Sequence, residues 1–552
     1  MCSLPPGSPK DERQRAVIPS RTMFLPVPGD RAGKPARRHC LADERGIRMA
    51  LLQAATESGP VIGTHSGNPE ITVFRGIPYA APPTGKLRWA PPQQAEPWKE
   101  PYHAYAFRDI PMQVEERHPF YSNEFYRCRK PMSEDCLYLN IWTPAESSGA
   151  GLPVMFFMHG GGFKSGYSHE ITFDGDGLAQ QGVILVTIEY RLGSLGFLAH
   201  PACVCEGDRH ARGNFGTLDQ IFALKWVKNN IAAFGGDPDN ITVFGQSAGA
   251  MSVENLITSP LSKECVAKAI MQSAGGYVSE KYCAIRMLRF EDAAAYGEKF
   301  FAFLGCKSLE EARACPADKL VEQERIFTET ICPGFFFAPI VDRYSQVMPV
   351  SEAVKQYCYA DVPCMLGATN FENGAATYLP AGDREAFLQF VDSRFGTEGD
   401  AFLKLIGFEE NPEKAMLEGG WDDLLKPGIF AWADHAARRP ERSKTYLYHF
   451  TRKLPGGDGA GAYHSSELWY VFQTVQRCWR ELTGVDYDLS RAMVKYWSNF
   501  AKTGDPNGDR LPQWTPYTSA CRGSMELGEQ IGMTDYTGSQ RVRFIVEHIL
   551  KQ

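Results

Sequence analysis

The sequence predicts an α/β protein in which a mostly parallel sheet is covered by helices on both faces. Short, largely apolar runs at 154–158, 183–188 and 268–272 have the length of strands. Continuous apolar runs of this length are typical of strands that are buried on both faces. Between such runs lie helical stretches, as at 219–231, where apolar residues recur every three or four positions. This alternation indicates strand–helix–strand units and therefore a parallel sheet.

Composition narrows the function classes. The chain has 552 residues, of which 43% are apolar and 22% are charged, so it can bury a large core. A net charge of −7 argues against binding to nucleic acid. We expect no membrane span, because no apolar run approaches the ~18 residues that a crossing needs. The 15 cysteines show no metal-binding spacing, so we expect no metal or cofactor and a reducing, cytoplasmic location.

The chain divides into a short extension and one long domain. Residues 1–48 hold seven prolines and ten Lys or Arg against five Asp or Glu, which favours a disordered basic extension. We expect residues 49–552 to form a single catalytic domain. Less regular helical patterns at about 278–361 and 385–440 indicate cap-like insertions that cover the sheet above the active site.

The most informative stretch is 241–249, ITVFGQSAG. A strand at 241–244 runs into a G-x-S-x-G turn, and a helix is expected from Ala248 to about Thr258. This arrangement lifts a serine hydroxyl, here that of Ser247, clear of a parallel sheet. The glycines at both ends of the motif are needed because a Cβ would collide with the neighbouring backbone.

Three other loops follow predicted strands and carry matching chemistry. The strand at 154–158 leads into His159 and three glycines, whose N–H groups can bind a developing oxyanion. Glu372 follows the strand at 362–367, and His464 lies in a glycine-rich loop after the strand at 445–450. Because the working site of an open α/β sheet lies beyond the carboxyl ends of its strands, we expect these loops to meet.

The chemistry expected from this set is acyl transfer. His464 would take the proton of Ser247 during attack, and Glu372 would hold the imidazole in the useful tautomer. Asp342 and Glu467 stay open as alternative acids on chemistry alone. Of the other histidines, His159 is expected to shape the glycine loop, whereas those at 435 and 449 suit structural roles.

Several segments in order resemble the type-B carboxylesterase/lipase family, the cholinesterase-like branch of the α/β-hydrolase fold. The resemblance covers roughly residues 58–530 and is nearest to bacterial para-nitrobenzyl-esterase-like enzymes. Residues 234–250 are similar to the serine signature of the family, and residues 134–140 are similar to its second signature. Further similar segments are 74–83, 214–220, 461–472 and 496–507.

The resemblance implies a role for each candidate residue. It implies Ser247 as nucleophile, His464 as base and Glu372 as acid, because the family's acid lies five residues after the glycine that matches Gly367. The implied oxyanion donors are Gly161, Gly162 and Ala248. Ser273 matches a family serine that supports the acid.

Two positions depart from the family pattern. Asn373 replaces the glycine that commonly follows the acid. Cys136 matches a cysteine that is disulfide-bonded in secreted members, but the partner position holds Ile110, and Cys128 would close a different bridge. The missing partner agrees with a cytoplasmic enzyme.

These observations predict a serine carboxylesterase that acts on small-molecule esters with small to medium acyl or alcohol groups. Fold and triad fix the reaction type but not the substrate. A non-catalytic binding protein, an amide or carbamate hydrolase and an acyltransferase therefore stay as alternatives. The oligomeric state is not predicted.

Overall fold

The computed structural model describes residues 49–114, 119–126, 130–203, 211–277, 285–372, 384–418, 421–535 and 540–551. All of these residues belong to one compact unit, Cys40–Gln552. The extension predicted for residues 1–48 lies outside the described residues.

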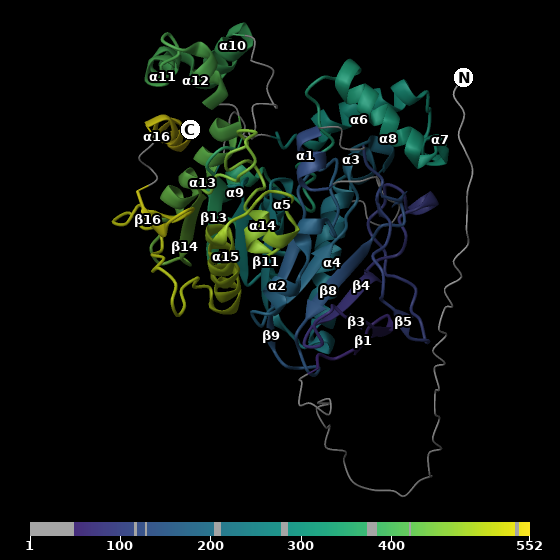
Figure 1. Ribbon diagram of the computed structural model, residues 1–552. Helices are drawn as coiled ribbons and strands as arrows, with labels where there is room; N and C mark the ends of the chain where they lie inside the picture. Colours follow the sequence, from purple (N-terminus) through teal and green to yellow (C-terminus); the bar gives the residue numbers. More distant parts are fainter. Residues whose placement is uncertain are drawn as a thin grey trace, which may run out of the picture. The chain divides into compact units, whose positions relative to one another are not determined.

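The described residues build a central sheet of 11 strands (Figure 1). In spatial order these are β16 (Ile531–Thr534), β15 (Ser524–Leu527), β14 (Thr445–Phe450), β13 (Cys364–Thr369), β12 (Lys268–Gln272), β11 (Gly236–Gln246), β9 (Leu152–Met158), β10 (Ile184–Ile188), β8 (Tyr138–Thr143), β4 (Thr72–Pro78) and β3 (Thr64–His65). The strands from β10 to β15 pair in parallel, and antiparallel strands flank this run at both edges. Smaller sheets join β1 (Gln53–Thr56), β2 (Gly59–Ile62) and β5 (Tyr102–His103), and pair β6 (Ile110–Pro111) with β7 (Met132–Ser133). The sheet confirms the predicted α/β-hydrolase fold class.

Helices cover both faces of this sheet because successive side chains of each strand point to opposite faces. Phe156 of β9 belongs to the apolar cluster that includes residues of α4 (Phe215–Asn230), α5 (Ala248–Thr258) and α13 (Trp421–Ala436). Its neighbour Phe157 belongs to a second cluster with α2 (Asp176–Ala179), α14 (Leu468–Val471) and α15 (Gly484–Thr503). Both side chains are fully buried, which explains the continuous apolar run in the sequence.

The remaining helices are mostly in the two predicted insertions. The first insertion contains α6 (Phe290–Leu304), α7 (Leu309–Ala314), α8 (Ala317–Ile326) and α9 (Val350–Lys355), and the second contains α10 (Arg384–Phe395), α11 (Gly399–Leu405) and α12 (Pro412–Glu418). Helix α13, which the sequence placed in the second insertion, contacts β13 and β14 and is part of the sheet's flank. Elsewhere lie α1 (Pro119–Glu124), α3 (Gly193–Phe197) and α16 (Gln540–Lys551).

Three elements start earlier than the sequence pattern predicts. Strand β9 begins at Leu152 and not at 154. Helix α4 begins at Phe215 and not at 219, because its first turn contains Gly216 and Thr217, which interrupt the apolar spacing. Strand β11 begins at Gly236, which pairs with Leu152 ahead of an irregularity in the ladder. Helix α5 and strands β12 and β14 have the predicted bounds.

Candidate active site

Ser247 lies at a strained turn between β11 and α5. Its backbone has φ 58° and ψ −126°, a region that non-glycine residues rarely adopt. The turn is fixed by its own backbone, since Ser247 N donates to Gln272 O at 2.8 Å and Ser247 O accepts from Ala250 N at 2.8 Å. The strain is therefore held by the packed sheet on one side and by the helix on the other.

Glycine at position 249 is a packing requirement of this turn. A Cβ on Gly249 would lie 2.0 Å from the backbone oxygen of Met158, at the end of β9. Helix α5 can therefore approach the central strands only if this residue lacks a side chain. The same close approach brings the loop after β9 to the turn, because a Cβ on Gly160 would lie 3.0 Å from Ser247 Cβ.

The glycine loop after β9 is a tight turn with positive φ values. Gly161 and Gly162 have φ values of 104° and 64°. The carbonyl oxygen of Gly161 accepts from Lys164 N at 3.1 Å and from Ser165 N at 3.0 Å, which tightens the turn. Ala248 follows Ser247 as the first residue of α5, at the positive end of this helix.

Glu372 and His464 are brought together by a backbone bridge between their loops. Phe371 and Tyr463, the residues just before them, pair in parallel, and Phe371 N donates to Ala462 O at 3.0 Å. This isolated bridge joins the loop that follows β13 to the loop that follows β14. As a result, His464 Nδ1 lies 2.5 Å from Glu372 Oε2.

The environment of Glu372 favours its charged form. Burial alone would raise the pKa of this carboxyl group, but His464 and Lys426 together with the Thr369 N–H hold the pKa below its ordinary value. The N–H of Thr369 donates to Glu372 Oε1 at 2.8 Å. Both carboxylate oxygens are therefore engaged, and one of them faces the imidazole.

The second nitrogen of His464 faces the residue before the serine. Gln246 Nε2 lies 3.1 Å from His464 Nε2, and the Gln246 side chain is buried. With a proton on Nδ1 for Glu372, Nε2 carries the lone pair, and the Gln246 amide donates to it. No sequence pattern explains a glutamine at this position, and this contact supplies a reason for it.

The two alternative acids have other partners. Asp342 accepts from Gln346 N at 2.8 Å and from Ser345 Oγ at 2.7 Å, so it closes its own loop. Glu467 is buried, and its Oε1 accepts from Ser273 Oγ at 3.4 Å. Burial, followed by the charge of Glu372, raises the pKa of Glu467 to about 7.

Ser273 therefore contacts the carboxyl group of Glu467. The expected support of Glu372 by this serine stays a prediction. After burial, the charge of Glu372 also raises the pKa of Glu467, so the two buried carboxyl groups lie close enough to interact.

The remaining histidines considered from the sequence have structural surroundings. His159 is buried, its ring stacks on Tyr190, and its backbone oxygen accepts from Tyr190 Oη at 2.9 Å. His435 Nε2 lies 3.1 Å from Val354 O, and His449 is buried within β14. His159 thus shapes the start of the glycine loop.

A buried ionic cluster that no sequence pattern indicated lies behind the His464 loop. Arg480 donates through Nη2 to Glu124 Oε2 at 2.8 Å, and both side chains are buried. Glu124 also accepts from Tyr463 Oη, the residue before His464. Helix α1, which carries Glu124, makes a second hydrogen bond to this loop, because Tyr121 Oη donates to His464 O at 3.4 Å. The aromatic-rich stretch around α1 was visible in the sequence, but nothing in its pattern indicated these partners.

The two departures from the family pattern have different outcomes. Cys136 is a free, buried cysteine, and burial raises the pKa of its thiol, which makes it unreactive. Ile110, at the expected partner position, is buried in β6. Asn373 and Cys128 lie outside the described residues.

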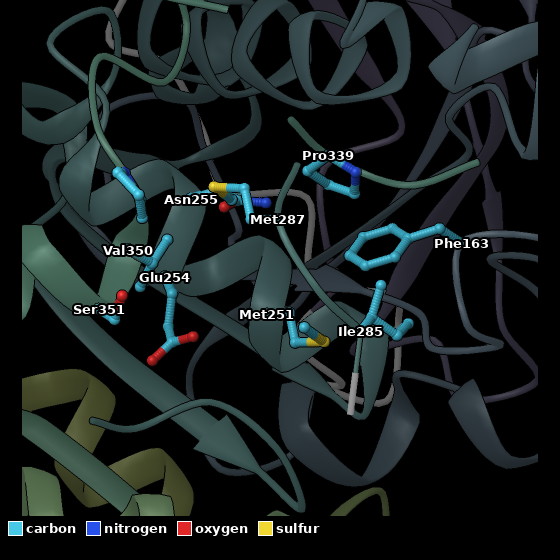
Figure 2. Close-up of a pocket in the computed structure, with 10 residues that line it drawn as sticks. Phe163, Met251, Glu254, Asn255, Ile285, Met287, Pro339, Val350 and Ser351 are labelled. Carbon is cyan, nitrogen blue, oxygen red and sulfur yellow. The ribbon is translucent and has the colours of Figure 1, made fainter. Parts of the chain in front are cut away.

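Two cavities adjoin the glycine loop. A small one of about 60 Å³ lies against Phe163 of this loop and Met251, one turn after Ser247 in α5. In Figure 2 the side chains of Phe163, Met251 and Ile285 gather around it, and the carboxyl group of Glu254 points away from them. A larger cavity of about 310 Å³ includes Lys164 of the same loop.

Neither a metal cluster nor a membrane helix is found in the part of the chain that the structure describes. No group of three or more His, Cys, Asp or Glu side chains there is arranged to hold a metal ion. Among the helices of the described residues, none has both the length and the hydrophobicity for crossing a bilayer.

Comparison with known proteins identifies the family. A sequence profile of the carboxylesterase family matches residues 51–398 and 407–545. The fumonisin B1 esterase of Sphingopyxis macrogoltabida is 33% identical over 498 residues, which are 88% of this chain and 87% of that protein. The para-nitrobenzyl esterase of Bacillus subtilis is 32% identical over 504 residues, covering 88% of this chain and 96% of that protein.

Solved structures agree with the sequence matches. A para-nitrobenzyl esterase structure has a TM-score of 0.75 and 29% identity, and the match covers 89% of this chain and 99% of that one. A carboxylesterase of Geobacillus stearothermophilus has the same TM-score and identity, with 90% and 100% of the two chains covered. The chain therefore belongs to the carboxylesterase family and is a hydrolase of carboxylic esters.

Proposed function

We propose that Ser247, His464 and Glu372 are the catalytic triad of a serine carboxylesterase. The observation that carries this proposal is the 2.5 Å contact between His464 Nδ1 and the buried carboxylate of Glu372. A base that is oriented by a third group, beside a serine on a strained turn, is the arrangement that activates a hydroxyl.

In the first half-reaction, Ser247 Oγ attacks the ester carbonyl carbon, and its proton passes to His464 Nε2. For this transfer the Gln246 amide gives up its contact with Nε2. Glu372 stabilises the imidazolium that forms, because its carboxylate is charged and adjacent. The imidazolium then protonates the leaving alcohol, and a water molecule repeats the sequence on the acyl-enzyme.

The oxygen of the tetrahedral intermediate would be bound by the N–H groups of Gly161, Gly162 and Ala248. Removal of one donor in comparable sites costs roughly 3–4 kcal/mol of transition-state stabilisation. These donors are backbone groups whose positions are set by packing, so they need no reorganisation during the reaction.

We further propose that the substrates have small to medium acyl or alcohol groups. The small apolar cavity beside Phe163 and Met251 supports this range, since about 60 Å³ holds only a short chain. Residence in the cytoplasm stays a prediction, supported by the buried free thiol of Cys136.

The test is covalent labelling with a fluorophosphonate, followed by mass spectrometry. We expect one adduct, on Ser247, and we expect Ser247→Ala to lose the adduct together with more than about a thousandfold in kcat for p-nitrophenyl butyrate. Ser273 is a matched control, because it also follows a strand and has a positive φ of 53°. Ser273→Ala should still label at Ser247. Full activity of Ser247→Ala would refute the proposal.

A further inference from the structure

Lys164 lies at the edge of the glycine loop. Its backbone N–H donates to Gly161 O at 3.1 Å, so its position is fixed by the turn. A Cβ built on Gly162 would lie 3.9 Å from Lys164 Cγ and 4.0 Å from Lys164 Cε. The aliphatic stem of this lysine therefore runs past Gly162, one of the proposed oxyanion donors.

The ammonium group of Lys164 faces an aromatic wall. Its Nζ lies 5.7 Å from the ring centre of Phe336, and Phe336 is 41% exposed. Both residues line the cavity of about 310 Å³, to which Phe335 and Phe337 also contribute. An exposed ring beside a cation can hold the carbon chain of a ligand whose charged end meets the cation.

The other charged groups around this cavity have partners. Arg325 is bound on both sides, by Glu322 at 2.6 Å and by Glu329 at 2.5 Å. Glu324 is buried, accepts from Ser194 N at 2.7 Å, and has its pKa raised by burial.

Lys164 differs from these groups. Among the residues that the structure describes, it forms no ion pair and feels the carboxyl group of Glu324 only through their Coulomb interaction. It is therefore the cation of this cavity that an added anion would meet.

We propose that Lys164 and the Phe335–Phe337 wall form a subsite for a carboxylate carried by the substrate. The preferred substrates would then be esters with a free carboxylate a few bonds from the scissile carbonyl, such as half-esters of short dicarboxylic acids. This inference rests on the proposed function, because it places the subsite beside the oxyanion donors of the same reaction.

The experiment compares charged and neutral esters as ratios of kcat/KM. Monoethyl glutarate and ethyl pentanoate form one pair, with the carboxylate on the acyl side. Acetoxybutyrate, the acetate ester of 4-hydroxybutyrate, and butyl acetate form the other pair, with the carboxylate on the alcohol side. We expect Lys164→Met, which keeps most of the stem, to lower the charged-to-neutral ratio about tenfold in at least one pair.

Two variants control for side effects of the substitution. Lys164→Arg keeps the charge and should keep the ratio within about threefold of the wild type. Lys299 is an exposed lysine on α6 whose Nζ lies 5.2 Å from the ring centre of Tyr296, so Lys299→Met removes an equivalent cation elsewhere and should keep both ratios. In the wild type, the ratio should also fall at about 1 M salt, where charges are screened.

Equal ratios in wild type and Lys164→Met for both pairs would overturn the subsite. Failure of the proposed function has a separate signature, which is loss of turnover for the neutral esters together with absence of the adduct on Ser247. A drop in the ratio for one pair supports the subsite and assigns the carboxylate to that side of the ester.

Discussion

Replacing Glu372 by glutamine is the sharpest perturbation of the proposed triad. The substitution keeps the size of the side chain, which is buried, and removes its charge. A glutamine amide can also donate to His464 Nδ1, at the position where Glu372 Oε2 now lies 2.5 Å away. The imidazole would then carry its proton on Nε2 and could not take the proton of Ser247.

The expected loss follows from the charge and the tautomer. Two unit charges about 4 Å apart interact by about 4 kcal/mol at an effective dielectric constant of about 20. The imidazolium loses this stabilisation in the variant, which corresponds to about a thousandfold in rate, since each 1.36 kcal/mol is tenfold. The reversed tautomer adds to the loss, so we expect kcat to fall by about 10³ to 10⁴.

The assay is kcat for p-nitrophenyl butyrate at pH 6, with Glu467→Gln as the matched control. Glu467 is buried in the same cluster, and its pKa of about 7 leaves it mostly protonated at this pH. Glutamine resembles a protonated glutamic acid, so Glu467→Gln should keep kcat within about threefold. If Glu372→Gln stays within tenfold of the wild type and Glu467→Gln loses a thousandfold, the assignment of the acid is wrong.

Two further predictions concern stability, each measured by urea unfolding. Gly249→Ala places a Cβ 2.0 Å from Met158 O and should lower the free energy of unfolding by about 3 kcal/mol or more. Gly484→Ala is the control and should not lower it, because no atom lies within 4 Å of the added Cβ. Equal losses in the two variants would contradict the packing argument. Burial raises the pKa of Glu254 from 4.5 to about 8, so the folded state binds the extra proton and stability should fall as pH rises through this window. Glu254→Gln should remove that fall, so the free energy of unfolding of the variant minus that of the wild type should increase by a few kcal/mol between about pH 5 and 8. A difference that does not change with pH would refute the raised pKa.

Much of the site could be predicted because its key residues follow strands. Ser247 was predictable from a few neighbours, since the strand, the glycines and the helix that shape its turn are contiguous. His464 and Glu372 were predictable as loop residues at the carboxyl edge of the sheet, where parallel strands of the same sheet end together. Their direct contact is seen only in the structure, through the bridge between Phe371 and Tyr463.

Other features had no signal in the sequence because they join segments that lie far apart along it. The contact between Gln246 and His464 spans 218 positions, and that between Glu124 and Arg480 spans 356. The contact of Ser273 Oγ with Glu467, 194 positions away, likewise had no signal in the sequence.

The sequence by itself determined the fold class, the strained serine turn and the glycine loop, because periodicity and turn chemistry act between neighbouring residues. The tertiary structure decided which carboxyl group meets His464, what the Gln246 amide contacts, and that Lys164 faces Phe336. The physical reason is the difference in range. Local backbone preferences can be read along the chain, whereas distances between side chains and the burial that shifts their pKa values exist only once the sheet has brought distant loops to one edge.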